Sequence, residues 1–179
     1  DSFLVFWMVI SVVDFSKLSS EFDAAKDFKS SHKSVCIVSD DMSRLEPYLQ
    51  SGVSVIDNLE DSMKAAFATT KADTVICDVL SPVSDIAARI AKSMDMRVVR
   101  VAASDKEASL LSQDEQIDWA KKANDADEFY VAGESDDMEV NERAKNSWMR
   151  NRADAALLVT DGSRTKAYDF GNDFGAIDA

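Results

Sequence analysis

The stretch from residue 141 to residue 163 constrains the fold most strongly, because it joins a helical pattern to a short buried strand. Apolar side chains recur every four positions in its helical part, which predicts one buried helical face: Val140, Ala144 and Trp148. Residues 155–159 then form an apolar run of the length typical of a strand buried on both faces. Ligands of open α/β sheets bind outside the carboxyl ends of such strands. We therefore expect a site near Asp161.

Strand and helix patterns alternate along most of the chain. Further strands are expected over residues 34–39, 53–56, 74–77, 97–102 and 128–131. Helices are expected over residues 16–29, 42–50, 59–70 and 83–94, with a charged helical region over residues 105–124; the clearest amphipathic pattern is that of residues 83–94. This alternation predicts an α/β fold with a Rossmann-like, open and mostly parallel sheet covered by helices on both faces.

The length of 179 residues suits a single domain, which we expect to span residues 1–179. Residues 1–33 are interpreted as an N-terminal extension of one strand and one helix, and residues 166–179 as a C-terminal tail. The extension contains the most apolar run, residues 3–13, which we expect to be a buried strand; the alternative is an interfacial or oligomer-forming segment. Eleven residues are too few for a membrane-spanning helix, so no membrane partner is expected.

The formal net charge of −13 argues against nucleic acid as a partner, because no basic run offsets it. Two interpretations remain open. The charge either keeps the protein soluble or forms an acidic surface that docks on a basic protein partner. The N-terminal strand and the helix that carries Trp148 are candidate surfaces for a homo-oligomer.

Cysteine and histidine usage narrows the chemistry. Cys36 and Cys77 lie in apolar strand-like runs, so we expect buried, unpaired thiols and a reducing, cytoplasmic setting. His32 is the only histidine, which excludes a histidine-rich zinc site, and no metal site is predicted. Trp119, Trp148, Tyr130 and Met149 are expected to pack within the protein rather than to stack on bases.

Carboxylates gather where the predicted strands end: Asp14, Asp40, Asp41, Asp57, Asp78, Asp85, Asp105, Glu134 and Asp161. Such groups can cap helices, hold Mg²⁺ together with a phosphate, or bind ribose hydroxyls. A glycine-rich phosphate cradle is missing, since residues 78–85 contain Pro82 and no glycine. The cations expected near this edge are Arg44, Lys145 and Arg164.

The run KNSWMRNRADAALLVTDG, residues 145–162, resembles the late motif of the YpsA-like proteins of the SLOG superfamily, approximately R-N-x-W-M-V-D-x-A-D-x-L-I-A-V-W-D-G. The matching positions, in order and spacing, are Asn146, Trp148, Met149, Ala153, Asp154, Asp161 and Gly162. The segments over residues 81–101 and 124–135 are similar in order, and the resemblance covers roughly residues 34–165. Lys145 replaces the family arginine, and Ser163, Arg164 and Thr165 follow Gly162, so that the family's double glycine is missing and only Thr165 corresponds.

The resemblance implies a Rossmann-like fold with a nucleotide-type pocket near Asp85, Asn146 and Asp161. The superfamily includes hydrolases of nucleotide N-glycosidic bonds and domains that sense nucleotide-derived ligands. The residues expected to bind the ligand are Asp40, Ser81, Ser84, Asp85, Asn146, Asp161, Gly162, Ser163 and Thr165. Mg²⁺ could accompany a nucleotide.

Three functions stay open at this point. The first is non-catalytic binding of a nucleotide or nucleotide-derived ligand at the strand ends. The second is a degenerate SLOG fold that serves as an acidic protein-interaction factor, for example one encoded by a phage or mobile element and binding a host protein. The third is a nucleotide N-glycosidase, with Asp85 or Asp161 as the catalytic carboxylate.

Overall fold

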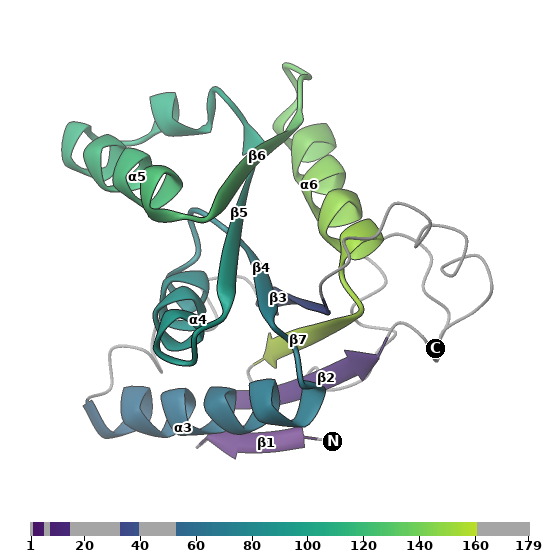
Figure 1. Cartoon of the computed structure of the whole chain (residues 1–179). Helices are drawn as coiled ribbons and strands as arrows, with labels where there is room; N and C mark the ends of the chain where they lie inside the picture. Colours follow the sequence, from purple (N-terminus) through teal and green to yellow (C-terminus); the bar gives the residue numbers. More distant parts are fainter. Residues whose placement is uncertain (1, 6–7, 15–32, 40–52, 161–179) are drawn as a thin grey trace.

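The computed structural model describes residues 2–5, 8–14, 33–39 and 53–160 (Figure 1). In this part of the chain, seven strands form one sheet in the order β1-β2-β7-β3-β4-β5-β6. The strands are β1 (Ser2–Val5), β2 (Met8–Asp14), β3 (Ser34–Ser39), β4 (Thr74–Asp78), β5 (Arg97–Ser104), β6 (Glu128–Gly133) and β7 (Ala155–Thr160). Strands β3 to β7 pair in parallel, whereas β1 and β2 are antiparallel to their neighbours.

The helices are α3 (Val53–Thr70), α4 (Pro82–Ser93), α5 (Gln113–Asp125) and α6 (Met138–Arg152), with a 3₁₀ helix η3 (Glu107–Leu110) before α5. They confirm the expected α/β fold with helices on both faces of a mostly parallel sheet. The expected helices over residues 16–29 and 42–50 and the tail over residues 166–179 lie outside the described residues.

The strand expected over residues 53–56 is wrong, because these residues open helix α3. Apolar residues recur there at helical spacing, which joins the short run to the helix after it: Val53, Ile56, Leu59, Met63 and Phe67. The N-terminal run is divided into two strands rather than one. β1 and β2 form an antiparallel pair, and β2 adds to the sheet beside β7.

Alternate side chains of the parallel strands β3, β4, β5 and β7 enter two separate cores. Val35 and Ile37 of β3 belong to the cluster covered by α3 and α4, whereas Cys36 and Val38 belong to the cluster on the side of α6. Figure 1 shows α3 and α4 on one face of the sheet and α6 on the other. Cys36 and Cys77 are buried free thiols, as expected, and burial raises the pKa of Cys77 to about 12, so that its thiol stays protonated.

The strand order advances from β3 to β6 and then returns to β7 on the far side of β3. Because parallel crossovers are right-handed, the return connection through α6 must cover the opposite face from the connections that advance. The reversal therefore falls between β3 and β7, which pair as far as Ser39 and Val159. Binding crevices of open α/β sheets form at such a reversal.

The buried face of α6 differs from the expected one by one position. Asn141, Lys145 and Met149 are buried, whereas Val140 is 40% exposed. The apolar pattern predicted the wrong face of the helix, because two of the three buried side chains are polar and have hydrogen-bond or ion-pair partners inside the protein. Lys145 serves the candidate site described below, and Asn141 organises the turn before its own helix.

Asn141 holds the β6–α6 turn against the sheet. Its side-chain oxygen accepts a hydrogen bond from the Ser135 backbone N–H at 2.9 Å, and its amide nitrogen donates to the Ser135 carbonyl at 2.7 Å. Gly133 lies close to the side-chain amide of Asn141. A Cβ atom at residue 133 would approach the Ala103 carbonyl oxygen to 2.6 Å and the Asn141 side-chain oxygen more closely still.

We predict that Gly133→Ala lowers the free energy of unfolding by about 1–3 kcal/mol, because the added methyl group overpacks this turn. Urea denaturation measures the change. The matched control is Glu134→Ala at the exposed neighbouring residue, which should alter stability by less than about 0.5 kcal/mol. Equal stabilities of the two variants would contradict the close approach.

Candidate functional site

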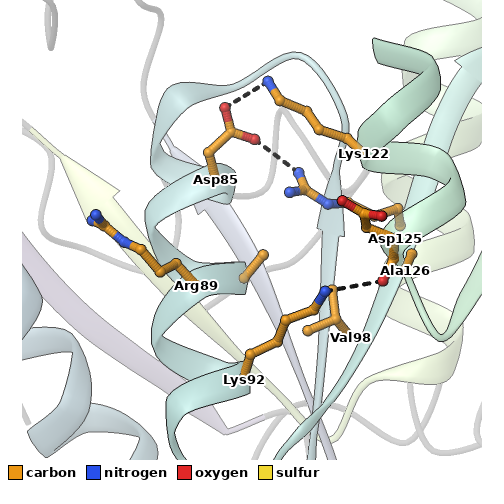
Figure 2. A pocket seen from close by; sticks show the side chains of 9 residues that line it. Asp85, Arg89, Lys92, Val98, Lys122, Asp125 and Ala126 are labelled. Atoms are coloured by element: carbon orange, nitrogen blue, oxygen red, sulfur yellow. Dashed lines mark hydrogen bonds and ion pairs between the residues drawn. The ribbon is translucent and has the colours of Figure 1, made fainter. Parts of the chain in front are cut away.

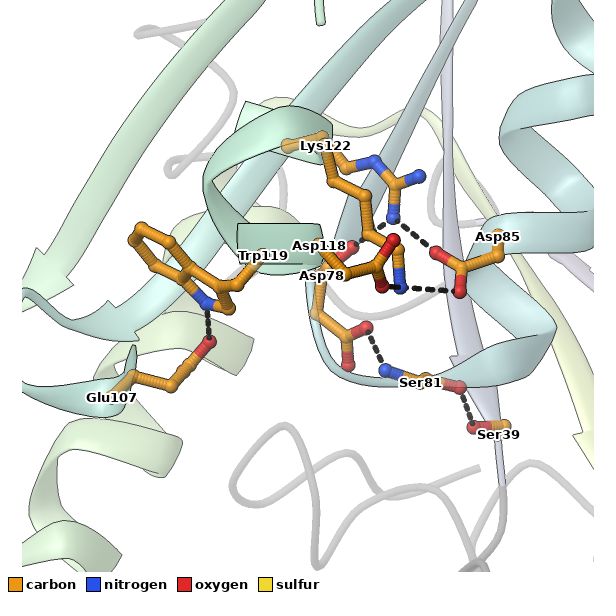
Figure 3. Close-up of polar contacts among 9 residues, drawn as sticks. Ser39, Asp78, Ser81, Asp85, Glu107, Asp118, Trp119 and Lys122 are labelled. Atoms are coloured by element: carbon orange, nitrogen blue, oxygen red, sulfur yellow. Dashed lines mark hydrogen bonds and ion pairs between the residues drawn. The ribbon is translucent and has the colours of Figure 1, made fainter. Parts of the chain in front are cut away.

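The carboxyl ends of β3 and β4 meet through two serine hydroxyls (Figure 3). Ser39 ends β3, and its Oγ lies 3.2 Å from Oγ of Ser81 in the loop after β4. The Ser81 backbone N–H donates to Oδ1 of Asp78 at 3.0 Å. Ser81 is the N-cap of α4, but its side chain makes no capping bond and contacts Ser39 instead. Two hydroxyls and the first turn of a helix thus meet at this sheet edge.

Asp78 and Lys145 form an inward-facing ion pair between β4 and α6. The Lys145 ammonium lies 3.3 Å from Asp78 Oδ2 and 2.5 Å from Glu142 Oε1, and its side chain is 7% exposed. Burial alone would lower the pKa of Lys145, but the charges of Asp78 and Glu142 outweigh it and raise the pKa. Burial likewise opposes ionisation of Asp78, yet Lys145 and the hydrogen bonds from Ser81 and Ser84 keep its pKa below the usual value.

Asp85, in the first turn of α4, binds two cations from other elements. One carboxylate oxygen lies 3.1 Å from the Arg100 guanidinium of β5, and the other lies 2.7 Å from the Lys122 ammonium of α5. Arg100 also donates to the Asp78 carbonyl at 2.8 Å. Both Asp85 oxygens are therefore engaged, and the catalytic role considered for this carboxylate would require displacing a cation.

Glu107 fixes η3 and α5 to the end of β5. Its carboxylate accepts hydrogen bonds from the Ala103 backbone N–H and from the Trp119 indole N–H, each at 2.9 Å. Burial of this group raises its pKa. The Trp119 ring packs edge-on against Phe129 with centroids 5.5 Å apart. Trp119 and the buried Met149 thus pack within the protein, as expected.

Trp148 and Tyr130 also make packing contacts within the chain. Their ring centroids lie 4.8 Å apart, and the Arg152 guanidinium lies 4.0 Å from the centroid of the Trp148 ring. These contacts agree with the packing role expected for both aromatic residues.

The structure brings three of the predicted ligand-binding residues together. Ser81, Ser84 and Asp85 share the first turn of α4, with Ser84 buried beside Asp78. Asn146 lies on α6, half-buried and one residue beyond Lys145. The remaining predicted site residues lie outside the described part of the chain: Asp40, Asp161, Gly162, Ser163 and Thr165.

Several residues of this network were not predicted from the sequence as parts of the site: Ser39, Arg100, Glu107 and Lys122. Arg100 offered one signal, because it interrupts the apolar strand RVVRVAAS and is nonetheless 6% exposed. An arginine at such a position requires an acceptor within the fold. The other three residues offered no comparable signal, since a serine, a glutamate and a lysine at these positions are equally typical of solvent-exposed sites.

Two further observations bear on cofactors and membranes. Over residues 2–5, 8–14, 33–39 and 53–160, no group of three or more His, Cys, Asp or Glu side chains is placed to hold a metal ion. No helix among these same residues combines the length and apolar character needed to cross a bilayer.

Models of known protein families give no match to this sequence, and the curated proteins contain no relative that matches it. The SLOG resemblance therefore stays a prediction that depends on the motif over residues 145–162.

We predict that Lys145→Met destabilises the protein by about 3–5 kcal/mol, because it leaves Asp78 without the cation that compensates its buried charge. Denaturant unfolding measures the loss. The double variant Asp78→Asn/Lys145→Met should be more stable than Lys145→Met alone, since it removes the unpaired charge. Lys106→Met, which breaks the exposed contact with Asp136, is the control and should change stability little.

The lowered pKa of Asp78 also predicts how the stability of the protein changes in acid. Because its folded pKa lies below the ordinary value of 3.8, its contribution is complete above that value and is lost as the pH falls through the folded pKa. The stability advantage of the native protein over Asp78→Asn should therefore stay constant above about pH 5 and shrink as the pH falls from there towards about 2. Unfolding curves of both proteins across this range test the prediction, and a constant difference would contradict it.

Proposed function

We propose that this protein binds a nucleotide or nucleotide-derived ligand at the carboxyl ends of β3, β4 and β7, without converting it chemically. The observation that carries the proposal is the meeting of Ser39 and Ser81 at 3.2 Å, beside Asp78 and next to the reversal of strand order. Open α/β sheets bind ligands in this location. Hydroxyl and carboxylate groups are suitable partners for ribose hydroxyls.

The charged side chains at this edge support binding rather than catalysis. Asp78 is paired with Lys145, and Asp85 is paired with Arg100 and Lys122. A general base must have a lone pair directed at the substrate proton, and both oxygens of Asp85 already face cations. An N-glycosidase is for this reason the less supported function.

The ligand's phosphate groups would meet no glycine cradle here, because residues 78–85 lack glycine. The first turn of α4 offers backbone N–H groups and the positive end of the helix dipole instead. The resemblance of residues 145–162 to the SLOG motif supports the same ligand class. A nucleoside part would then lie along the β3–β4 edge, with the serine hydroxyls as hydrogen-bond partners.

An acidic protein-interaction role is the second candidate, and helix α5 favours it. None of its residues is fully buried, and Ile117 is 64% exposed beside acidic residues. Leu110, just before this helix, is 72% exposed. Exposed apolar side chains within an acidic surface are suited to a protein partner whose binding surface has an apolar centre surrounded by basic residues.

The proposed ligand site is tested by thermal unfolding with nucleosides, mono- and dinucleotides and ADP-ribose, with and without Mg²⁺. A ligand present at 100 times its Kd should stabilise the native state by about 2.7 kcal/mol. Ser81→Ala should weaken binding of that compound roughly three- to tenfold, because one hydroxyl hydrogen bond is lost. Product analysis should find the ligand intact.

Ser93→Ala is the matched control, since Ser93 is exposed at the opposite end of α4. Its affinity for the ligand should equal that of the native protein. If no compound in the panel stabilises the protein, the result contradicts nucleotide binding and favours the protein-interaction role. Equal affinities of the Ser81→Ala and Ser93→Ala variants would place the ligand away from the serine pair.

A further inference from the structure

A cavity of about 270 Å³ lies between helices α4 and α5, over the β5 side of the sheet (Figure 2). Val98 of β5 lies among the lining residues, and Ala126, just after α5, lies near one end. We call this cavity the α4–α5 groove. The hydroxyls of Ser39 and Ser81 are not part of its lining, so it is separate from the site proposed above.

The charged lining of the groove is mostly cationic, which sets it apart from a chain with a net charge of −13. Four cations and two carboxylates line it: Arg89, Lys92, Arg100, Lys122, Asp85 and Asp125. A concave surface concentrates the field of its charges, so an anion is attracted to this groove more than to the surrounding surface.

Lys92 is the cation best placed to bind an external anion. Its ammonium donates to the backbone carbonyl of Asp125 at 3.0 Å, and no carboxylate of the described residues lies within ion-pair distance of it. A neutral carbonyl leaves the positive charge uncompensated and leaves two further N–H donors on the ammonium.

The other cations differ in how readily they can respond. Arg89 contacts Glu60, but its side chain is 63% exposed, and exposed ion pairs are weak enough to exchange for a ligand. Arg100 is held by Asp85, whereas Lys122 contacts both Asp85 and Asp118. Arg89 points away from Lys92 in Figure 2, so Lys92 is the adaptable cation of the groove, whereas Arg100 and Lys122 are fixed.

We propose that the α4–α5 groove binds a small phosphorylated sugar or polyol. Lys92 binds the phosphate, whose oxygens suit charge-assisted hydrogen bonds from its ammonium. The Asp125 carboxylate, which also lines the groove, accepts hydrogen bonds from ligand hydroxyls. The volume lies just below the range of pockets for drug-sized ligands, which suits a molecule of a few carbons.

Isothermal titration calorimetry with ribose 5-phosphate, glycerol 3-phosphate, inorganic phosphate and unphosphorylated ribose tests the proposal. At least one of the two phosphorylated polyols should bind more tightly than inorganic phosphate, and ribose should not bind detectably. Lys92→Met should weaken binding roughly tenfold or more, as expected for a lost hydrogen bond to a charged group. Lys92→Gln, which can still donate to the Asp125 carbonyl, should be weakened to a similar extent.

Lys64→Met is the matched control, because it removes the same charge from an exposed position on α3. Equal weakening by Lys64→Met and Lys92→Met would overturn the proposal, since it would indicate general charge attraction. Binding of inorganic phosphate as tight as that of both polyol phosphates would also overturn it. Ser81→Ala should bind the phosphorylated polyol normally, which separates this site from the proposed nucleotide site.

Discussion

The carboxyl edge of the sheet depends on Asp78, because this one residue links four separate elements. Asp78 is the last residue of β4. Its carboxylate accepts a hydrogen bond from the Ser81 backbone N–H before α4 and pairs with Lys145 of α6. Its backbone carbonyl accepts a hydrogen bond from the Arg100 guanidinium of β5. Removing charges from water is costly, and this arrangement offsets the cost only because nearly every donor has an acceptor at hydrogen-bond distance. The position of α6 against the sheet is therefore set by polar contacts as well as by apolar packing.

This network determines what the neighbouring site can do. A side chain held by fixed partners presents the same geometry before and after a ligand arrives, which lowers the cost of ordering on binding. The same partners reduce the freedom of Asp78 and Asp85 to accept a substrate proton. Rigidity at this edge thus favours recognition over turnover. The two serine hydroxyls are the groups best able to reorient, since a hydroxyl hydrogen rotates to suit its partner.

The sequence pattern predicted the architecture well wherever apolar periodicity was strong. The strand over residues 34–39 has the predicted bounds, and α4 differs from its expected range by one residue at each end. β3 is buried on both faces and α4 on one, and in each case the apolar pattern follows the burial, so the sequence predicts both elements. The division of the N-terminal run into β1 and β2 was not predicted, because neighbouring apolar residues give no sign of where a strand reverses.

The site was harder to predict for a different physical reason. The face of α6 that enters the protein carries Asn141 and Lys145, whose partners come from a turn and from β4. Helical periodicity records apolar residues only, so a buried face built on polar pairs is assigned to solvent. Arg100 presents the same difficulty within a strand. Sequence patterns locate the edge at which a site forms but not the long-range pairs that shape it.

Charge distribution connects the two proposed sites. Helix α4 carries Asp85 in its first turn and Lys92 in its last, so its carboxylate and its uncompensated ammonium lie at opposite ends. Asp85 binds Arg100 and Lys122 and thereby holds two cations of the α4–α5 groove in place. An acidic protein attracts anions only where its cations are gathered and kept from pairing with the surrounding surface. The groove meets this condition at Lys92 alone, because the Asp125 backbone carbonyl, rather than a carboxylate, positions its ammonium.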